Sequence, residues 1–155
     1  MGDAAFRFGY RWLFASMLGM VGLGALLIVA DTRWLPWYPA AMTEAFWGAA
    51  ELPPEVVRYH RFVHAVLGAT ILSWAVALLF VLRGPFRERR RWAYGCVAVS
   101  LLSWFVPDTA ASLFHGAWPN AVFNLTALVA LGAPLVFLRR AFAIDRPDLD
   151  VGADA

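Results

Sequence analysis

A polar stretch between two apolar runs carries many of the side chains with which this chain could do chemistry. In WFVPDTAASLFHGAWPNAVFN, residues 104–124, the residues Asp108, Ser112 and His115 follow one another at spacings of four and three. In a helix this spacing places them on one face, and Asn120 and Asn124 share a face of the next helix in the same way. A short connection makes the two helices antiparallel neighbours. We therefore expect Asp108 and Asn124 to meet at one level of this helix pair.

A second group of polar residues lies upstream, where His60 and His64 are four residues apart with Arg61 between them. His64 is expected at the same level of the helix bundle as Asp108, and Arg61 about one turn nearer to the end of the bundle. An ionised carboxylate inside a bilayer costs a few kcal/mol, so Asp108 should have a partner. His64, His115, Arg61 or a proton could satisfy it.

Two interpretations of this constellation stay open. In the first, the side chains form a polar pocket that binds a headgroup, a quinone or another lipophilic small molecule, or that relays protons. In the second, they only bridge helices, as asparagine, serine and histidine do in many membrane proteins. The candidate ligand-binding residues are Asp108, His64, His115, Ser112, Asn120, Asn124 and Arg61.

A metal or haem site is a third interpretation, because three histidines near one level could supply nitrogen ligands. The ligands would be His60, His64 and His115, with Asp108 nearby. The chain has no CxxCH motif, and a single cysteine excludes an intramolecular disulfide, a CxxC pair and a thiolate cage. A metal or haem site therefore stays as the least favoured of the three interpretations, and no cofactor is assigned.

The elements that must position these residues are four apolar runs in a chain of 155 residues that is 61% hydrophobic. Soluble domains contain roughly 45–50% apolar residues, so the composition favours a membrane protein. The predicted helices cover about 11–30, 54–83, 92–114 and 119–139, and each approaches the ~20 residues that cross a bilayer. The expected fold is all-α, a single domain over 1–144 with four transmembrane helices. Residues 145–155 are expected to form a disordered cytoplasmic tail.

Several local features refine this bundle. The aromatic segment AAMTEAFWGAAE, between the first two spans, predicts a short helix at the membrane interface. The part of the third helix before Pro107 is too short to cross, so the helix either continues through Pro107, with a kink, to Phe114, or breaks there in mid-membrane, and we favour the kink. Small residues on the first helix predict a helix-packing face, and the one cysteine is expected in the core. These residues are Ala15, Gly19, Gly22 and Cys96.

All basic residues are arginines, and they are distributed unevenly along the chain. They do not form the exposed basic face of a nucleic-acid-binding protein, so no nucleic-acid partner is expected. Arginine-rich short loops stay in the cytoplasm, which predicts a multi-pass protein of the bacterial inner membrane with both termini inside. The cytoplasmic arginines would be Arg7, Arg11, Arg83, Arg87, Arg89, Arg90, Arg91, Arg139, Arg140 and Arg146, against Arg33, Arg58 and Arg61 outside.

The segments YHRFVHAVLGATILSW and SWFVPDTAASLFHGAWPNAVFN resemble small bacterial four-helix membrane proteins of the DoxX-like and BphX-like groups. The resemblance covers roughly residues 54–138 and implies a four-helix inner-membrane fold. It brings no established reaction and no catalytic residues. The expected function is binding of a lipophilic ligand in an outer-leaflet pocket around Asp108. The alternative is an accessory or scaffolding subunit of a larger membrane complex, or a homo-oligomer.

Overall fold

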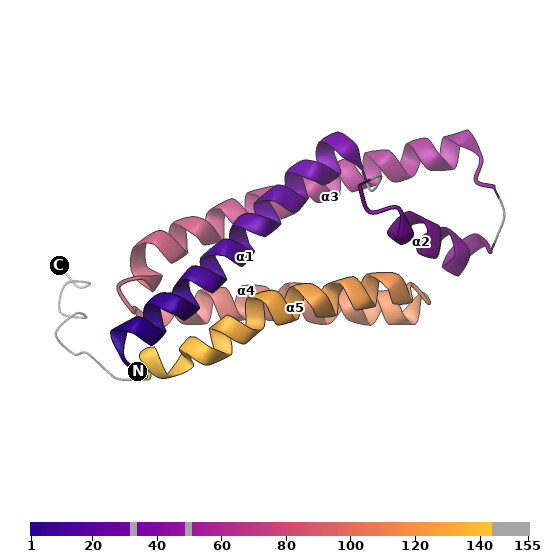
Figure 1. The fold of residues 1–155 in the computed structure, drawn as a ribbon. Coiled ribbons are helices and arrows are strands. Elements are labelled where there is room, and N and C mark those ends of the chain that lie inside the picture. Colours follow the sequence, from indigo (N-terminus) through magenta and orange to yellow (C-terminus); the bar gives the residue numbers. More distant parts are fainter. Residues whose placement is uncertain (32–33, 49–50, 144–155) are drawn as a thin grey trace.

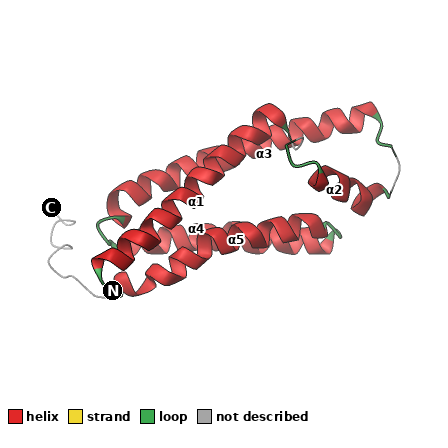
Figure 2. Cartoon of the chain, viewed as in Figure 1, coloured by secondary structure: helices red, strands yellow, loops and turns green. Residues whose placement is uncertain are grey.

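The protein is all-α in the residues described by its computed structural model, which are 1–31, 34–48 and 51–143 (Figures 1 and 2). No strand occurs among these residues, so the predicted fold class is confirmed. Two short helical turns follow α3 and α5, at Leu82–Phe86 and Arg139–Ala141. The helices are α1 (Asp3–Ala30), α2 (Trp37–Trp47), α3 (Pro54–Val81), α4 (Arg91–Phe114) and α5 (Trp118–Leu138).

Four of these helical segments are long and apolar enough to cross a membrane: Asp3–Ala30, Pro54–Phe86, Arg91–Phe114 and Trp118–Ala141. Large apolar side chains point outward from them, including Phe80 at 72% exposure and Phe114 at 85%. A protein dissolved in water would leave this surface in contact with solvent, whereas lipid covers it in a bilayer. The chain is therefore a multi-pass membrane protein.

The helices form a wedge that is closed at one end and open at the other (Figure 1). Helix α1 packs mainly on α3, and the antiparallel neighbours α4 and α5 form a second pair. The pairs converge near the N-terminus and diverge toward α2 (Figure 1). A buried core fills the converging end, with Leu13, Met17, Leu82, Phe86 and Leu138 among its members.

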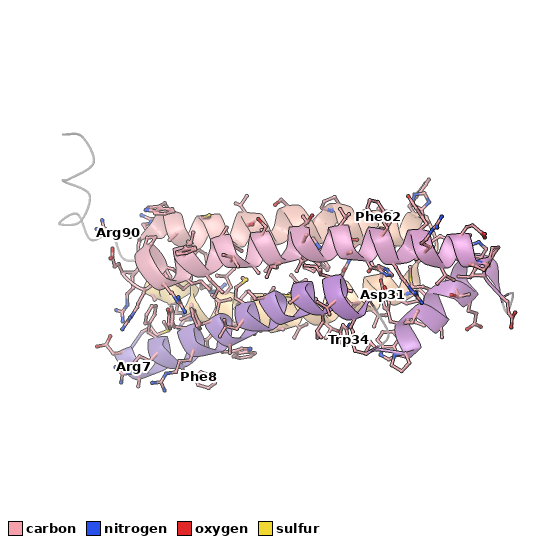
Figure 3. The ribbon with its side chains drawn as sticks, turned by 90° about the horizontal axis from the view of Figure 1, so that it is seen from above. Arg7, Phe8, Asp31, Trp34, Phe62 and Arg90 are labelled. Atoms are coloured by element: carbon pink, nitrogen blue, oxygen red, sulfur yellow. The ribbon has the colours of Figure 1, made fainter. Side chains whose placement is uncertain are left out.

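Charge is also unevenly distributed between the two ends. In Figure 3, Arg7 and Arg90 lie at the converging end, and Asp31 and Trp34 lie at the opposite end. Two arginines of the converging end are held by aromatic rings. The guanidinium of Arg89 lies 4.3 Å from the centre of the Phe6 ring, and that of Arg83 lies 5.4 Å from the centre of Phe14.

The ends of the helices follow the expected turn chemistry. The backbone of Gly84 leaves the helical region at the turn between α3 and α4. Gly116, with φ +73°, ends α4, as glycine tolerates this left-handed conformation without strain. Pro119 then lies in the first turn of α5, where its missing N–H is not needed.

Two helices begin earlier than predicted, and a third extends as far as predicted. Helix α1 begins at Asp3 rather than at residue 11, and α2 spans Trp37–Trp47 rather than beginning at Ala40. Helix α4 continues through Pro107 to Phe114, as its length required. The tail predicted for 145–155 lies outside the described residues, as do Arg33 and Arg146.

Two predictions about packing were wrong. A Cβ added to Gly19 or Gly22 would have no atom within 4 Å, and with Ala15 these glycines face outward. Close approach occurs instead between Gly24 of α1 and Gly68 of α3. A Cβ on Gly24 would lie 2.7 Å from the Gly68 carbonyl oxygen. Cys96 is exposed on α4 rather than in the core.

Candidate functional site

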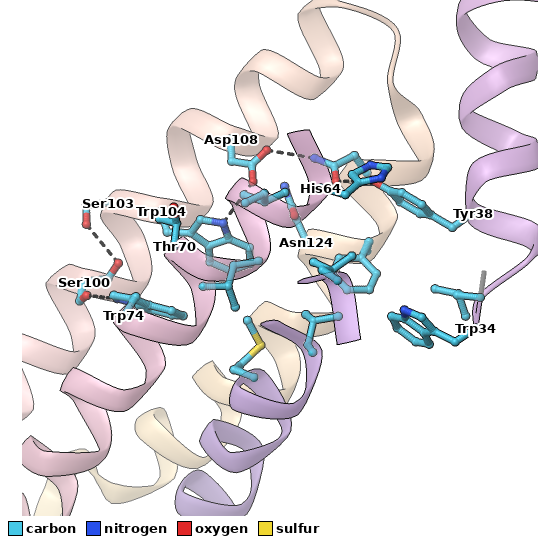
Figure 4. A pocket seen from close by; sticks show the side chains of 18 residues that line it. Trp34, Tyr38, His64, Thr70, Trp74, Ser100, Ser103, Trp104, Asp108 and Asn124 are labelled. Atoms are coloured by element: carbon cyan, nitrogen blue, oxygen red, sulfur yellow. Dashed lines mark hydrogen bonds between the residues drawn. The ribbon is translucent and has the colours of Figure 1, made fainter. Parts of the chain in front are cut away.

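A cavity of about 370 Å³ occupies the open end of the wedge (Figure 4). Ligand-binding cavities commonly measure about 300–1,000 Å³. Its walls are mostly apolar and aromatic, with polar groups from α3, α4 and α5. All four long helices, the segment after α1 and the first turn of α2 contribute to it. The aromatic lining consists of Trp34, Tyr38, Trp74, Trp104 and Phe123, and the aliphatic lining of Met20, Leu23, Leu27, Leu35, Leu67 and Ile71.

Asp108 is the centre of a hydrogen-bond network on one wall of this cavity (Figure 4). Its Oδ1 accepts from Asn120 Nδ2 at 3.0 Å, and Ser112 Oγ lies 3.3 Å from the same oxygen. Its Oδ2 accepts from Trp104 Nε1 at 3.1 Å. Trp104 and Ser112 lie one turn before and one turn after Asp108 on the same helix, which is why they reach it. The carboxyl group is thus bound by neutral donors.

Asn120 joins α4, α5 and α2. Its Nδ2 donates to Asp108 and, at 2.8 Å, to Ser112 Oγ, while its Oδ1 accepts from Tyr38 Oη at 2.8 Å. Burial raises the pKa of Tyr38 to about 12, and the nearby charge of Asp108 adds to the increase. The hydroxyl of Tyr38 is therefore held in its neutral, donating form.

The remaining polar groups of the lining are tied to the helices that carry them. Asn124, which is only 2% exposed, donates to Thr109 Oγ1 across the α4–α5 contact at 3.2 Å. Trp74 of α3 donates to Ser100 Oγ of α4 at 2.6 Å, and its ring centre lies 6.2 Å from that of Trp104. The two contacts of Trp74 connect the two helix pairs across the cavity.

A second polar group lies at the mouth of the cavity. The side chain of His64 lines the cavity, and its Nδ1 lies 2.5 Å from Asp31 Oδ1. Arg61 Nε lies 3.9 Å from the other oxygen of Asp31. The sequence left His64 and Arg61 open as possible partners of Asp108, and among the described contacts their acidic partner is Asp31.

Asp31 is a candidate site residue that the sequence did not reveal. It directly follows the first apolar run, so it appeared only as the charged end of that span. Its position before an aromatic segment carried no spacing that links it to His64, which is 33 residues away. One general rule could have suggested it: ionisable side chains inside a membrane usually pair with one another, so His64 should have an acidic partner.

The two other histidines do not join the site. His115 is exposed at the end of α4, against the ring of Phe114, and does not line the cavity. His60 faces Trp47, with ring centres 5.2 Å apart. Within residues 1–31, 34–48 and 51–143, no group of three histidine, cysteine or acidic side chains could hold a metal ion.

Of the predicted site residues, five therefore line one cavity or bind a residue that does: Asp108, Ser112, Asn120, Asn124 and His64. Arg61 is joined to them through Asp31, and His115 is not. This arrangement can hold an apolar body against aromatic rings while fixed acceptors orient a polar head. It defines the class as a four-helix membrane protein with a cavity at one end of the bundle.

No protein-family model, no curated protein and no solved structure matches this chain significantly.

Proposed function

We propose that this protein binds a lipophilic small molecule in the cavity, with the polar head of the ligand beside Asp108. The observation that carries the proposal is the cavity itself, about 370 Å³ of mostly apolar space with a hydrogen-bonded carboxyl group on one wall. A residue used only to join helices would have no need of such a space next to it. Asp108 lines the space and also binds α5 through Asn120.

The proposed ligand is an amphiphile that enters from the bilayer. Three cavity-lining residues, Leu67 and Thr70 of α3 and Ser103 of α4, are also exposed on the outside of the bundle. Helices α3 and α4 have few contacts with each other, so they pack loosely along this side of the cavity. An apolar tail could therefore lie between α3 and α4, toward the lipid.

The proposed location is a bacterial inner membrane, with the converging end and both termini in the cytoplasm and the cavity in the outer leaflet. The arginines support this orientation, since Arg7 and Arg90 lie at the converging end (Figure 3) and Arg83 and Arg140 lie in the turns that follow α3 and α5. The resemblance to DoxX-like and BphX-like proteins agrees with this location.

A matched pair of variants tests the proposal. Thr70 lines the cavity, and its hydroxyl donates to the carbonyl of Val66 in its own helix. Thr126 of α5 is exposed outside the cavity lining, and its hydroxyl donates to Val122 in the same way. Thr70→Phe should fill the cavity, whereas Thr126→Phe loses the same hydrogen bond and adds the same ring outside it.

The experiment purifies the three proteins in nanodiscs, extracts bound small molecules and identifies them by mass spectrometry. We expect one lipophile to be enriched with wild type and with Thr126→Phe and to be lost from Thr70→Phe. Equal recovery from all three proteins would contradict the proposal. An absorption spectrum of the same samples would reveal haem by its Soret band.

An accessory subunit is the second candidate function, favoured by the outward face formed by Ala15, Gly19 and Gly22. Small residues let a second helix approach closely inside a membrane. In this case Gly19→Leu should abolish co-purification of a partner chain or of a second copy. Retention of the small molecule in the cavity should not change.

A further inference from the structure

The pair formed by His64 and Asp31 is placed to control the hydrogen bonding of the cavity. Asp31 ends α1 with a positive φ of 56°, at the point where the chain leaves the helix. Its backbone carbonyl accepts from Trp34 Nε1 at 2.9 Å, and its two carboxyl oxygens face His64 and Arg61. The side chain of Asp31 is only 18% exposed. Contacts of its backbone carbonyl and of its carboxyl group thus hold the side chain of Asp31 beside His64.

This contact determines which ring nitrogen of His64 carries the proton. An ionised carboxyl group only accepts hydrogen bonds, so Nδ1 must be the donor toward Asp31 Oδ1. In a neutral imidazole the other nitrogen, Nε2, then has a free lone pair. No described residue makes a hydrogen bond to Nε2, and the ring lines the cavity. With a neutral ring, His64 therefore presents an acceptor to a bound molecule.

The donors of the aromatic lining are already used within the protein. Each indole or phenol group that lines the cavity donates to a protein oxygen. The four pairs are Trp34 to the Asp31 carbonyl, Tyr38 to Asn120, Trp74 to Ser100, and Trp104 to Asp108.

Acceptors, in contrast, are left over. Asp108 Oδ2 accepts one hydrogen bond, from Trp104, and a carboxylate oxygen can accept two. With His64 Nε2, the cavity thus has at least two acceptors that come from different helices, α3 and α4.

From these two acceptors we infer that the cavity selects a lipophile that brings hydroxyl donors, and that Asp31 is the positioning residue that makes His64 one of the two acceptors. The class of ligand is a dihydroxylated amphiphile with a flat or compact head, one hydroxyl donating to His64 and the other to Asp108. This inference rests on the proposed function and names the chemistry of the same cavity.

The first test compares three probes of nearly equal shape: an alkylresorcinol, its monomethyl ether and its dimethyl ether. Isothermal titration calorimetry on the protein in nanodiscs gives their affinities, with empty nanodiscs as the blank. Each blocked hydroxyl leaves a cavity acceptor unpaired, so affinity should fall about tenfold per methyl group. Thr70→Phe should bind none of the three.

The second test examines the role of Asp31 through the ratio of the affinities for the diol and the dimethyl ether. In Asp31→Asn an amide N–H can donate to Nδ1, which lets the proton move to Nε2 and turns His64 into a donor. The ratio should fall about tenfold, and Asp31→Glu should retain most of it. Asp3→Asn is the control, because it alters another contact with arginine, Arg89, at the far end of the bundle. The control should keep the wild-type ratio.

The outcomes separate this inference from the proposed function. If all three probes bind wild type equally and none binds Thr70→Phe, the cavity binds a lipophile as proposed. The selection of hydroxyl donors would then be overturned. Absence of binding of any probe, with a different lipophile recovered from the purified protein, would also overturn the selection. If Asp31→Asn does not fold, His64→Phe replaces it, since it keeps a ring without an acceptor. An unchanged ratio in that variant would overturn the role of the pair.

Discussion

The side chain of Asp108 is surrounded by N–H donors, and this determines the effect of replacing it by asparagine. Its oxygens accept from Trp104 Nε1 and from Asn120 Nδ2. The indole nitrogen can only donate, so the new amide group would have to turn its NH₂ toward Asn120. Asn120 would then flip, and Tyr38 would have to accept instead of donate. Asparagine is therefore a poor substitute for Asp108 even if the residue only bridges helices.

We expect Asp108→Asn to fold with a thermal stability a few degrees below wild type and to lose the bound lipophile. Asp108→Leu should be much less stable, because Trp104 and Asn120 lose their acceptor at a cost of about 1–3 kcal/mol each. Thermal unfolding in detergent and mass spectrometry of the bound ligand measure the two effects. Wild-type stability and full ligand retention in Asp108→Asn would show that the carboxyl group is not needed.

Tyr38 gives a prediction for alkaline pH. Burial, with a smaller contribution from Asp108, raises its pKa to about 12, from about 10 in the unfolded chain. The folded state then holds its proton longer, so this contribution to stability is complete below pH 10 and is lost between pH 10 and 12. The loss should approach about 2–3 kcal/mol.

The measurement compares unfolding of wild type and Tyr38→Phe at several pH values in that range. Phenylalanine removes the titrating group and the hydrogen bond to Asn120, so its stability should be about 1 kcal/mol lower at pH 8. The difference between the two proteins should shrink as the pH rises above 10 and change sign before pH 12, because wild type loses more than this difference of about 1 kcal/mol. A constant difference up to pH 12 would mean that Tyr38 is not buried against α5.

At the scale of helices, the contact between α1 and α3 depends on two glycines. A Cβ on Gly24 would lie 2.7 Å from the Gly68 carbonyl oxygen and 2.8 Å from the Leu72 nitrogen, and backbone atoms cannot turn aside. Gly24→Ala and Gly68→Ala should therefore destabilise the protein by about 1–3 kcal/mol. Gly19→Ala is the matched control on the same helix, with nothing within 4 Å of the added carbon.

The control should be neutral or slightly more stable, because alanine favours a helix over glycine by up to about 1 kcal/mol. Thermal unfolding in detergent compares the three variants with wild type. Equal stability of Gly24→Ala and Gly19→Ala would contradict the close approach of α1 and α3.

The sequence predicted the helices better than it predicted which of their faces meet. Long apolar runs and the position of Pro107 determined the four spans, because a shorter third helix could not cross. The face of α1 that packs on α3 was misplaced. Ala15, Gly19 and Gly22 are small residues like Gly24, so residue size alone does not show which of them contacts α3. Inside a membrane, inward and outward faces are both apolar, so hydropathy does not distinguish them. The exposed position of Cys96 was missed for the same reason.

For the candidate site, the sequence identified the residues on α4 and α5. It missed Asp31 and Tyr38, whose contacts depend on how the helices are arranged in space. Asp108, Ser112 and Asn120 lie close together because a short turn at Gly116 joins their helices. The contact of Asp31 with His64 depends on where α1 ends beside α3, and the contact of Tyr38 with Asn120 depends on where α2 lies. Neither contact has a local spacing in the sequence.

For the whole molecule, the arginines predict the orientation. A reporter that is active only in the cytoplasm, fused after residue 140, should be active, and one fused within α2, after Glu44, should be inactive. A periplasmic reporter at the same two positions should give the opposite result. Periplasmic activity after residue 140 would contradict the proposed topology.

The measurement that tests the central claim most directly is an electron cryomicroscopy map of the wild-type protein in nanodiscs. Because the protein is small, an antibody fragment is bound to it to make the particles large enough to align. We expect elongated non-protein density between His64 and Asp108, with its apolar part directed toward the space between α3 and α4. The same map of Thr70→Phe, with Thr126→Phe as the control, should lack this density. A wild-type cavity that is closed by contact of Trp74 and Leu67 with α5, or that contains only water, would contradict the account.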